Sequence, residues 1–296
     1  MKASAFSYHD PRSLDALYGL LGSLENCRLL AGGQSLMPML NMRYAFPDHV
    51  IDINRIEGLD AIKLTDQGLY IGAMTRQARL KDDPLVAAHA PVLAEALHWV
   101  GHVQTRSRGT IGGSLCHLDP AAEQPCIAAL YDAVLHVGGP RGSRDIAFKD
   151  WVLAYMTPAL EPDEILLGLT LPPFASGQSG SRIGHGFHEF ARRHGDYAIV
   201  AAAVLVALGQ DNKITRAAIS LAGVDVKPCR LHAAEEVLVG QSADPQTLEA
   251  AAKEAQKITM MEDAHISADY RQRLAVAMVK RALKDAVARA MGGHHG

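Results

Sequence analysis

Cysteine motifs are absent from this chain of 296 residues. Its four cysteines are spread along the chain without a C-x-x-C pair or a cluster, at Cys27, Cys116, Cys126 and Cys229. Structural zinc sites and iron–sulfur clusters need several thiolates at close spacing. We therefore expect buried thiols, and neither a metal site nor a cluster held by this chain.

Neither sign of charge dominates, and no apolar stretch is long. The formal net charge is −3 with basic residues scattered, which gives no electrostatic reason to expect nucleic acid or an anionic membrane as a partner. The longest strongly apolar run, residues 198–208, has 11 residues and is too short to span a bilayer as a helix. The first ten residues contain neither an apolar signal core nor a twin arginine. A soluble cytoplasmic protein without a membrane span is expected.

The two familiar nucleotide-binding motifs are also missing. The chain contains neither the dinucleotide fingerprint G-x-G-x-x-G nor the phosphate loop G-x-x-x-x-G-K-S/T. A doubly wound dinucleotide fold and a P-loop nucleotidase are therefore disfavoured. A diphosphate, if bound, must be held by another scaffold.

Two short glycine loops are present instead. Residues 28–38 read RLLAGGQSLMP, and residues 109–114 read GTIGGS, so Gly-Gly and a small hydroxyl residue occur twice. Glycine has no Cβ and tolerates positive φ, which allows consecutive backbone N–H groups to converge on phosphate oxygens. Either loop alone fits an ordinary tight turn, but the two together suit a diphosphate.

Hydrophobic periodicity predicts a mixed α and β chain that is long enough for two domains. Ser13 can cap a first helix, and the first 55 residues have the pattern of one small βαβ unit. In chain order we expect a helix at 14–24, strands at 28–30, 49–53 and 69–73, helical segments at 37–42, 75–80, 91–103 and 121–130, a turn at 138–140 and a strand at 165–171.

The second half changes character after residues 175–181, which have a linker-like composition. Two strands at 198–208 and 213–221 flank a hairpin turn at 209–212. Helices are expected at 231–239, 245–258 and 268–291.

On the predicted helix 91–103, His98 and His102 are four residues apart and can share a metal, but an acidic partner is missing and ordinary half-buried or solvated histidines fit better.

Three ordered motifs carry a resemblance to a known family. AGGQS at 31–35, TIGGS at 110–114 and ARRHGDYAIV at 191–200 closely resemble the FAD-binding medium subunit of molybdenum hydroxylases, the group of carbon monoxide dehydrogenase and xanthine dehydrogenase. The resemblance covers essentially the whole chain. It implies an α+β fold: a two-lobed FAD-binding domain of the vanillyl-alcohol-oxidase (PCMH) type at 1–177, with lobes at about 1–55 and 56–177. A C-terminal domain at 178–291 would have a three-stranded antiparallel sheet with helices, followed by a flexible tail at 292–296.

The resemblance also implies a set of FAD-binding residues. The diphosphate would lie against the two glycine loops, Glu123 stands where the family has an aspartate, His188 where xanthine dehydrogenase has a lysine, and Tyr197 where an aromatic ring covers the flavin. The full expected set is Leu30, Ala31, Gly32, Gly33, Gln34, Ser35, Leu36, Thr110, Ile111, Gly112, Gly113, Ser114, His117, Asp119, Glu123, Leu166, His188, Asp196 and Tyr197.

Some positions depart from the family pattern. Gln34 replaces a histidine that is common in the carbon monoxide enzymes, Ser114 replaces an asparagine, and His188 weakens the transfer of the lysine role. Relatives that reduce aromatic thioesters insert a cysteine-bearing loop for an extra cluster, and this chain has none. That reaction class is therefore disfavoured.

The function implied by the resemblance is electron transfer. Substrate would be oxidised at a molybdenum cofactor on a large subunit, and electrons would pass through two 2Fe-2S clusters on a small subunit to FAD in this chain and on to an external acceptor. A dimer of heterotrimers is the implied assembly, and no residue of this chain needs to act as a catalytic acid or base. Two alternatives are a free-standing flavoenzyme, for which His117, Asp119 and His188 are candidate acid–base residues, and a non-redox module that binds a nucleotide such as ADP.

Overall fold

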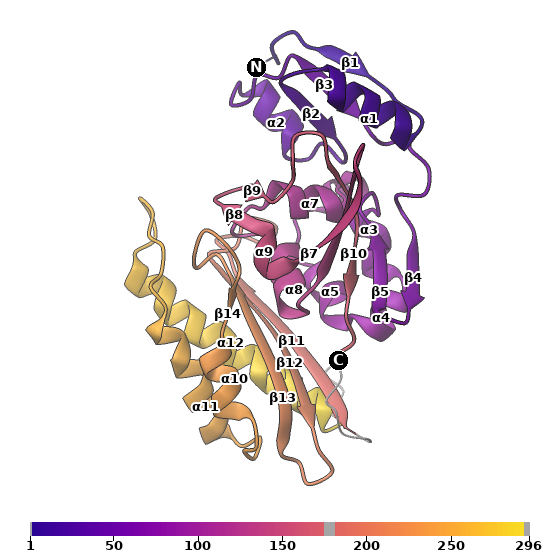
Figure 1. The fold of residues 1–296 in the computed structure, drawn as a ribbon. Helices are drawn as coiled ribbons and strands as arrows, with labels where there is room; N and C mark the ends of the chain where they lie inside the picture. Colours follow the sequence, from indigo (N-terminus) through magenta and orange to yellow (C-terminus); the bar gives the residue numbers. More distant parts are fainter. Residues whose placement is uncertain (1, 175–180, 293–296) are drawn as a thin grey trace.

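The computed structural model describes residues 2–174 and 181–292, which form three regions around three main sheets (Figure 1). The first region is a small N-terminal lobe with a parallel sheet, and the second is a lobe with a five-stranded sheet. The third is a four-stranded antiparallel sheet covered by the C-terminal helices. The expected α+β fold class is confirmed.

The N-terminal lobe presents the first glycine loop at the end of a parallel strand. Its elements are β1 (Ser7–His9), α1 (Leu14–Ser23), β2 (Cys27–Leu30), α2 (Leu36–Asn41) and β3 (His49–Asp52). Helix α1 begins as predicted, because the Ser13 side chain accepts a hydrogen bond from the Ala16 N–H. Strands β2 and β3 pair in parallel around α2, as the predicted βαβ unit requires. The loop between β2 and α2 is residues 31–35.

The second lobe is built on the sheet order β4-β5-β10-β6-β7. Its elements are β4 (Ile62–Thr65), β5 (Gly68–Gly72), α3 (Gln77–Asp82), α4 (Pro84–His89), α5 (Pro91–Ala96), α6 (Val103–Arg108), α7 (Ile111–His117), α8 (Glu123–Leu130), β6 (Val134–Gly139), β7 (Gly142–Ala147), α9 (Phe148–Trp151), β8 (Val152–Ala154), β9 (Thr157–Pro158) and β10 (Ile165–Leu171). The buried Trp151 indole N–H donates to the Leu115 carbonyl at 2.8 Å, which fixes α7 against the lobe. Helix α7 carries the second glycine loop.

The predicted helix at 91–103 is wrong in its length. Helix α5 ends at Ala96, and α6 begins only at Val103. Between them Gly101 has φ +44, a left-handed conformation that ends the helical path. The exposed His98 and His102 therefore share no helix face, and no group of three or more metal-binding side chains occurs within residues 2–174 and 181–292.

The C-terminal region packs a long helix against an antiparallel sheet. Its elements are β11 (Arg182–Phe190), β12 (Val200–Leu208), β13 (Ile214–Ala222), β14 (Cys229–Arg230), α10 (His232–Leu238), α11 (Pro245–Lys253), the 3-10 turn η1 (Glu254–Lys257) and α12 (Ala268–Ala290). The antiparallel sheet is confirmed, but it has four strands because β14 adds a short edge to β13. Helix α12 lies close to β11, since a Cβ at Gly186 would stand 2.2 Å from the Ala282 carbonyl oxygen.

The second lobe and the C-terminal sheet share one hydrophobic core. Phe187 of β11 and Ala203 of β12 pack in the same buried cluster as residues of α5 and α8. At the edge of this contact the Arg289 guanidinium binds both carboxylate oxygens of Glu95 and the His185 carbonyl at 2.7–3.1 Å. Strand β11 and helix α12 are thereby held beside α5 of the second lobe.

Three further expectations concern the chain ends and the linker. Residues 175–180 of the predicted linker, the boundary between 177 and 178, and residues 293–296 of the tail lie outside the described residues. The hairpin turn at 209–212 is confirmed, with Asn212 in a left-handed conformation at φ 63.

In the described part of the chain, no helix has both the length and the apolar character that a membrane crossing requires.

Candidate cofactor-binding site

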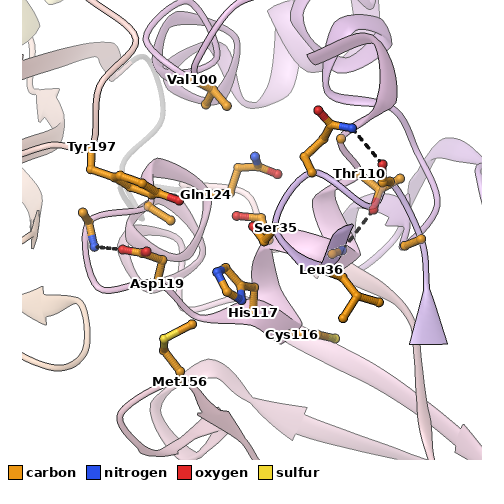
Figure 2. A pocket seen from close by; sticks show the side chains of 18 of the residues that line it. Ser35, Leu36, Val100, Thr110, Cys116, His117, Asp119, Gln124, Met156 and Tyr197 are labelled. Atoms are coloured by element: carbon orange, nitrogen blue, oxygen red, sulfur yellow. Dashed lines mark hydrogen bonds between the residues drawn. The ribbon is translucent and has the colours of Figure 1, made fainter. Parts of the chain in front are cut away.

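A cavity of about 1320 Å³ is lined by residues from all three regions (Figure 2). The N-terminal lobe contributes the first glycine loop, and the second lobe contributes the second glycine loop. The C-terminal region contributes Tyr197 and residues 263–266. The chain therefore builds one large site from its two glycine motifs and the third family-like motif.

The first glycine loop touches the second directly. A Cβ at Gly32 would stand 2.3 Å from the Arg108 carbonyl oxygen and 2.8 Å from the Gly109 Cα, so only glycine permits this approach. Gly33 has φ +70, which turns the chain from β2 into α2. The Gln34 side-chain amide donates to the Gly32 carbonyl at 3.0 Å and braces the turn.

The second glycine loop is tied to the end of β5. The Gly112 N–H donates to the Ala73 carbonyl at 2.8 Å, and a Cβ at Gly112 would stand 2.5 Å from the Ala73 Cβ. The Thr110 hydroxyl accepts a hydrogen bond from the Gly113 N–H at 3.1 Å and caps α7. These bonds fix the backbone of the loop on the cavity wall.

The segment after α7 brings polar side chains into the same cavity. Leu118 ends α7 in a left-handed conformation, with φ 52. In Figure 2, Asp119 lies near the Tyr197 ring, and His117 lies between Asp119 and Cys116. Burial lowers the pKa of His117, which Asp119 only partly offsets, so this imidazole is neutral at pH 7.

A ring and two amides are available to a ligand here. The Tyr197 side chain is 69% exposed although it lines the cavity. Gln77 and Gln124 also line the cavity, are 6% and 2% exposed, and have buried Oε1 atoms without a hydrogen-bond partner. Buried acceptors of this kind need a donor, and FAD carries ribityl hydroxyls and a ring N–H.

Two buried carboxyl groups lie beside the cavity, between α8 and β11. Glu123 lines the cavity, whereas the side chain of Glu189 is buried with both carboxyl oxygens lacking a partner. Burial raises the pKa of Glu123 and, more strongly, that of Glu189, and mutual repulsion adds to the increase for Glu189. We conclude that Glu189 holds a proton at neutral pH.

Most of the expected FAD-binding residues lie together on the cavity wall. The sixteen that line it are Ala31, Gly32, Gly33, Gln34, Ser35, Leu36, Thr110, Gly112, Gly113, Ser114, His117, Asp119, Glu123, Leu166, Asp196 and Tyr197. Leu30 lies behind the first loop, where it lines a smaller cavity of about 280 Å³. The Ile111 side chain belongs to the hydrophobic core.

The placement of His188 in the site is a correction. Side chains alternate across β11, so Phe187 and Glu189 face the second lobe, whereas His188 faces α12. Its Nε2 lies 2.8 Å from the Asp285 carboxylate on that helix. His188 is therefore on the face of the sheet opposite the cavity and does not match the lysine role.

Several cavity residues were missed from the sequence. Gln77, Gln124, Met156 and Arg271 line the cavity, but none belongs to a motif. Gln124 directly follows Glu123, which is the one local signal that pointed to it. Gln77 is linked to the second glycine loop only by a tertiary contact, since a Cβ added at Gly109 would stand 2.3 Å from the Gln77 Oε1. The sequence gives no sign of that contact.

These features fit FAD. The cavity is long enough to touch both glycine loops and Tyr197, and the missing Cβ atoms of Gly32 and Gly112 let the two loops approach each other and the end of β5. The free Gln77 and Gln124 oxygens can accept from the donors that FAD carries. The donor set contains no cluster of metal ligands within the described residues.

Comparison with known proteins identifies the same cofactor. One family model, described as the FAD binding domain in molybdopterin dehydrogenase, matches residues 4–174. A second, described as the CO dehydrogenase flavoprotein C-terminal domain, matches residues 185–286. Together the two matches cover both halves of the chain.

Individual relatives match over nearly their whole length. The chain is 37% identical to the 6-hydroxypseudooxynicotine dehydrogenase complex subunit alpha of Paenarthrobacter nicotinovorans, over 98% of this chain and 97% of that protein. It is 36% identical to the carbon monoxide dehydrogenase medium chain of Hydrogenophaga pseudoflava, over 96% and 98%. A chain of quinoline 2-oxidoreductase from Pseudomonas putida 86 superposes with a TM-score of 0.92 at 34% identity, over 98% of this chain and 100% of that one. The chain therefore belongs to the family of FAD-binding medium subunits of molybdenum-containing hydroxylases and dehydrogenases.

Proposed function

We propose that this chain is the FAD-carrying electron-transfer subunit of a hydroxylase or dehydrogenase whose molybdenum cofactor and two 2Fe-2S clusters lie on partner subunits. The observation that carries the proposal is the contact of the two glycine loops at the wall of a cavity that also exposes Tyr197. When bound, FAD supplies the redox chemistry, and the protein supplies its position and electrostatic environment.

The residues proposed to bind FAD are those that line the cavity. The first glycine loop binds the diphosphate through backbone N–H groups. The second loop lies against the first and sets its position, because the Gly112 and Gly113 N–H groups already donate to Ala73 and Thr110. Gln77 and Gln124 accept hydrogen bonds from the bound cofactor. Domain bounds at 1–177 and 178–291 are part of the same proposal, supported by family matches that end at 174 and resume at 185.

The assembly proposed for this chain is a dimer of heterotrimers in the cytoplasm. The relatives are named as subunits or medium chains, which supports partner chains. All four cysteines are free thiols, and free thiols persist in a reducing compartment. The proposal assigns the substrate pocket to the large subunit and leaves this chain to receive electrons.

Copurification and anaerobic reduction test the function. The native chain should copurify with a molybdenum subunit and an iron–sulfur subunit, and its flavin absorbance should bleach on addition of substrate only when both partners are present. Bleaching of the isolated chain would instead establish a free-standing flavoenzyme, for which His117 and Asp119 are the acid–base candidates in the cavity. A colourless chain that binds ADP would establish the non-redox alternative.

The segment at 191–199 is the proposed contact with the iron–sulfur subunit, because it borders the cavity. The His194 ring packs against the Trp99 ring in a tilted arrangement, with ring centroids 5.7 Å apart, which holds the segment, while Arg193 is exposed beside it. Arg193→Glu should slow flavin reduction by the partner about tenfold, since a reversed rim charge mainly lowers the association rate, with FAD content unchanged. Lys284→Glu at an exposed position of α12 is the control, and an equal effect of the two reversals would contradict this assignment.

Tyr197 is proposed to pack on the flavin ring. Aromatic pairs contribute about 0.5–1.5 kcal/mol beyond burial, so Tyr197→Ala should weaken FAD binding about 2- to 12-fold. Because an adjacent tyrosine quenches flavin emission, the bound flavin should also become brighter. Tyr155→Ala is the matched control, since Tyr155 is 56% exposed and does not line the cavity. Unchanged emission and affinity in the Tyr197 variant would remove the residue from the site.

A further inference from the structure

Two side chains join the glycine loops from behind. Neither Asn54 nor Arg76 lines the large cavity, and both lie next to the place where Gly32 meets the Arg108–Gly109 backbone. Asn54 follows β3 in the N-terminal lobe, whereas Arg76 directly precedes α3 in the second lobe. A bond between them therefore crosses from one lobe to the other.

Asn54 is fixed to the first loop. Its side-chain amide donates to the Ala31 carbonyl at 2.8 Å and to the Leu30 carbonyl at 3.3 Å. The same amide and the Asn54 backbone N–H both donate to the Asp52 carboxylate, at 2.6 and 2.8 Å. The orientation of the Asn54 carbonyl is thus set, and its Oδ1 points to Arg76.

Arg76 is fixed to the second loop and reaches back to Asn54. One guanidinium nitrogen donates to Asn54 Oδ1 at 2.6 Å, and another donates to the Arg108 carbonyl. The Arg76 backbone forms an antiparallel bridge with Thr110, and the following Gln77 N–H donates to the Gly109 carbonyl at 2.9 Å. The planar fork of arginine thus binds one group from each lobe at once.

Charges of both signs surround this arrangement. Burial and the neighbouring Arg108 lower the pKa of Arg76, while Asp52 and Asp60 offset part of that effect, and a guanidinium remains charged at neutral pH. Because two carboxylates accompany the two guanidinium groups, the arrangement acts on a diphosphate through the geometry of the loops and not through a net positive charge.

We propose that Asn54 and Arg76 form a clasp that sets the spacing of the two glycine loops and thereby positions the FAD diphosphate. The inference rests on the proposed FAD function. Both are positioning residues, since they act through the loop backbone and neither lines the large cavity, whereas Asn54 lines the smaller cavity of about 280 Å³ behind the first loop. The clasp pre-orders two loops from different lobes, so that less ordering is needed when the ligand binds.

The test is a double-mutant cycle on the FAD affinity of the full chain. FAD is removed from the purified chain, and dissociation constants for FAD and for ADP are measured for Asn54→Ala, Arg76→Met and the double variant. Each single variant should weaken both ligands about tenfold or more, and the double variant should be no weaker than the worse single variant, because one clasp is broken only once. Arg79→Met is the matched control: Arg79 donates to the Asp60 carbonyl at 2.9 Å, away from the loops, and its loss should change neither affinity more than about twofold.

Two further measurements separate positioning from general stability. Arg76→Lys keeps the charge but loses the fork, so it should not restore affinity; restoration would mean that charge alone acts and would overturn the clasp. Amide hydrogen exchange in the ligand-free variants should accelerate at 31–35 and 109–113 but not in α12. If Arg76→Met does not fold, Arg76→Gln and Asn54→Ala complete the cycle. Wild-type FAD affinity in folded variants, or additive losses in the double variant, would overturn the inference, whereas a wild-type chain that binds no FAD would overturn the proposed function itself.

Discussion

Replacing Gly32 with alanine is expected to cost the protein its FAD. A Cβ at this position would stand 2.3 Å from the Arg108 carbonyl oxygen, 2.8 Å from the Gly109 Cα and 2.9 Å from the Arg108 carbonyl carbon. Because backbone and not a flexible side chain blocks the methyl group, the two loops must separate. Gly32 is not among the residues with positive φ, so alanine introduces no conformational strain and the effect isolates the loop contact.

The expected loss in FAD affinity is about hundredfold, since separating the loops removes hydrogen bonds to the charged diphosphate that contribute about 1.5–3 kcal/mol each. The flavin-to-protein ratio after gel filtration and the dissociation constant of the ligand-free chain measure it. Gly22→Ala in α1 is the matched control, because a Cβ there meets nothing within 4 Å and alanine favours a helix by about 0.5–1 kcal/mol over glycine. A Gly32→Ala chain that retains a full complement of FAD would refute the assignment of the loops to the diphosphate.

Elements with local signals were predicted well from the sequence. The Ser13 cap located α1, the apolar run closed by two prolines located β10 at Ile165–Leu171, and the glycine turn located the β12–β13 hairpin. Each of these depends on contacts within a few residues. The two glycine loops were found for the same reason, because consecutive glycines indicate a backbone conformation or a close approach that other residues do not allow.

Elements determined by distant contacts were missed. Strand β11 alternates Gly184 and Gly186 with larger residues, and these glycines are explained only by the close approach of α12, about a hundred residues later. Of the β6–β7 hairpin, only a turn at 138–140 was predicted. The residues of β7 are mostly polar and exposed, so they do not have the apolar pattern that predicts a strand. The helix at 91–103 was predicted too long because Gly101 was not recognised as a left-handed stop.

The candidate site divides in the same way. Many residues inside the three motifs line the cavity, whereas Gln77 and the buried Glu189 come from segments whose sequence gives no functional signal. His188 was assigned by position alone, and the strand alternation that turns it toward Asp285 became visible only in the fold. Site geometry between lobes is a tertiary property, so it cannot be derived from local pattern.

Glu189→Gln is expected to stabilise the protein at alkaline pH. Burial and the nearby Glu123 raise the pKa of Glu189 to about 9, whereas an unfolded glutamate has a pKa of about 4.3. Cys126 of α8 also faces this pair, and burial raises its pKa to about 12, so the thiol is neutral too. The native state therefore keeps a proton on Glu189 that the unfolded chain releases.

The sign of the pH dependence follows from this difference. The contribution of Glu189 to stability is fully present below about pH 4.3, where both states are protonated, and is lost as the pH rises toward about 9. The free energy of unfolding falls over this window by up to about 1.4 kcal/mol per pH unit. Glutamine has the same shape but cannot ionise, so the variant should lose this slope and gain up to about 5 kcal/mol at pH 8 over wild type, with little difference near pH 4.5.

Urea unfolding of the ligand-free chain at pH 5, 6.5 and 8, followed by circular dichroism, measures the slope, and Glu236→Gln on α10 is the control because that side chain is exposed. An unchanged slope together with lower stability at pH 8 would mean that Glu189 is ionised in the native protein.

A protonated Glu189 also affects the charge of the cofactor site. Glu123 lines the cavity and Glu189 lies behind it, so a pair that retains at least one proton at neutral pH keeps the negative charge beside the cavity low, and an anionic ligand bound there meets less repulsion than two ionised carboxylates would exert.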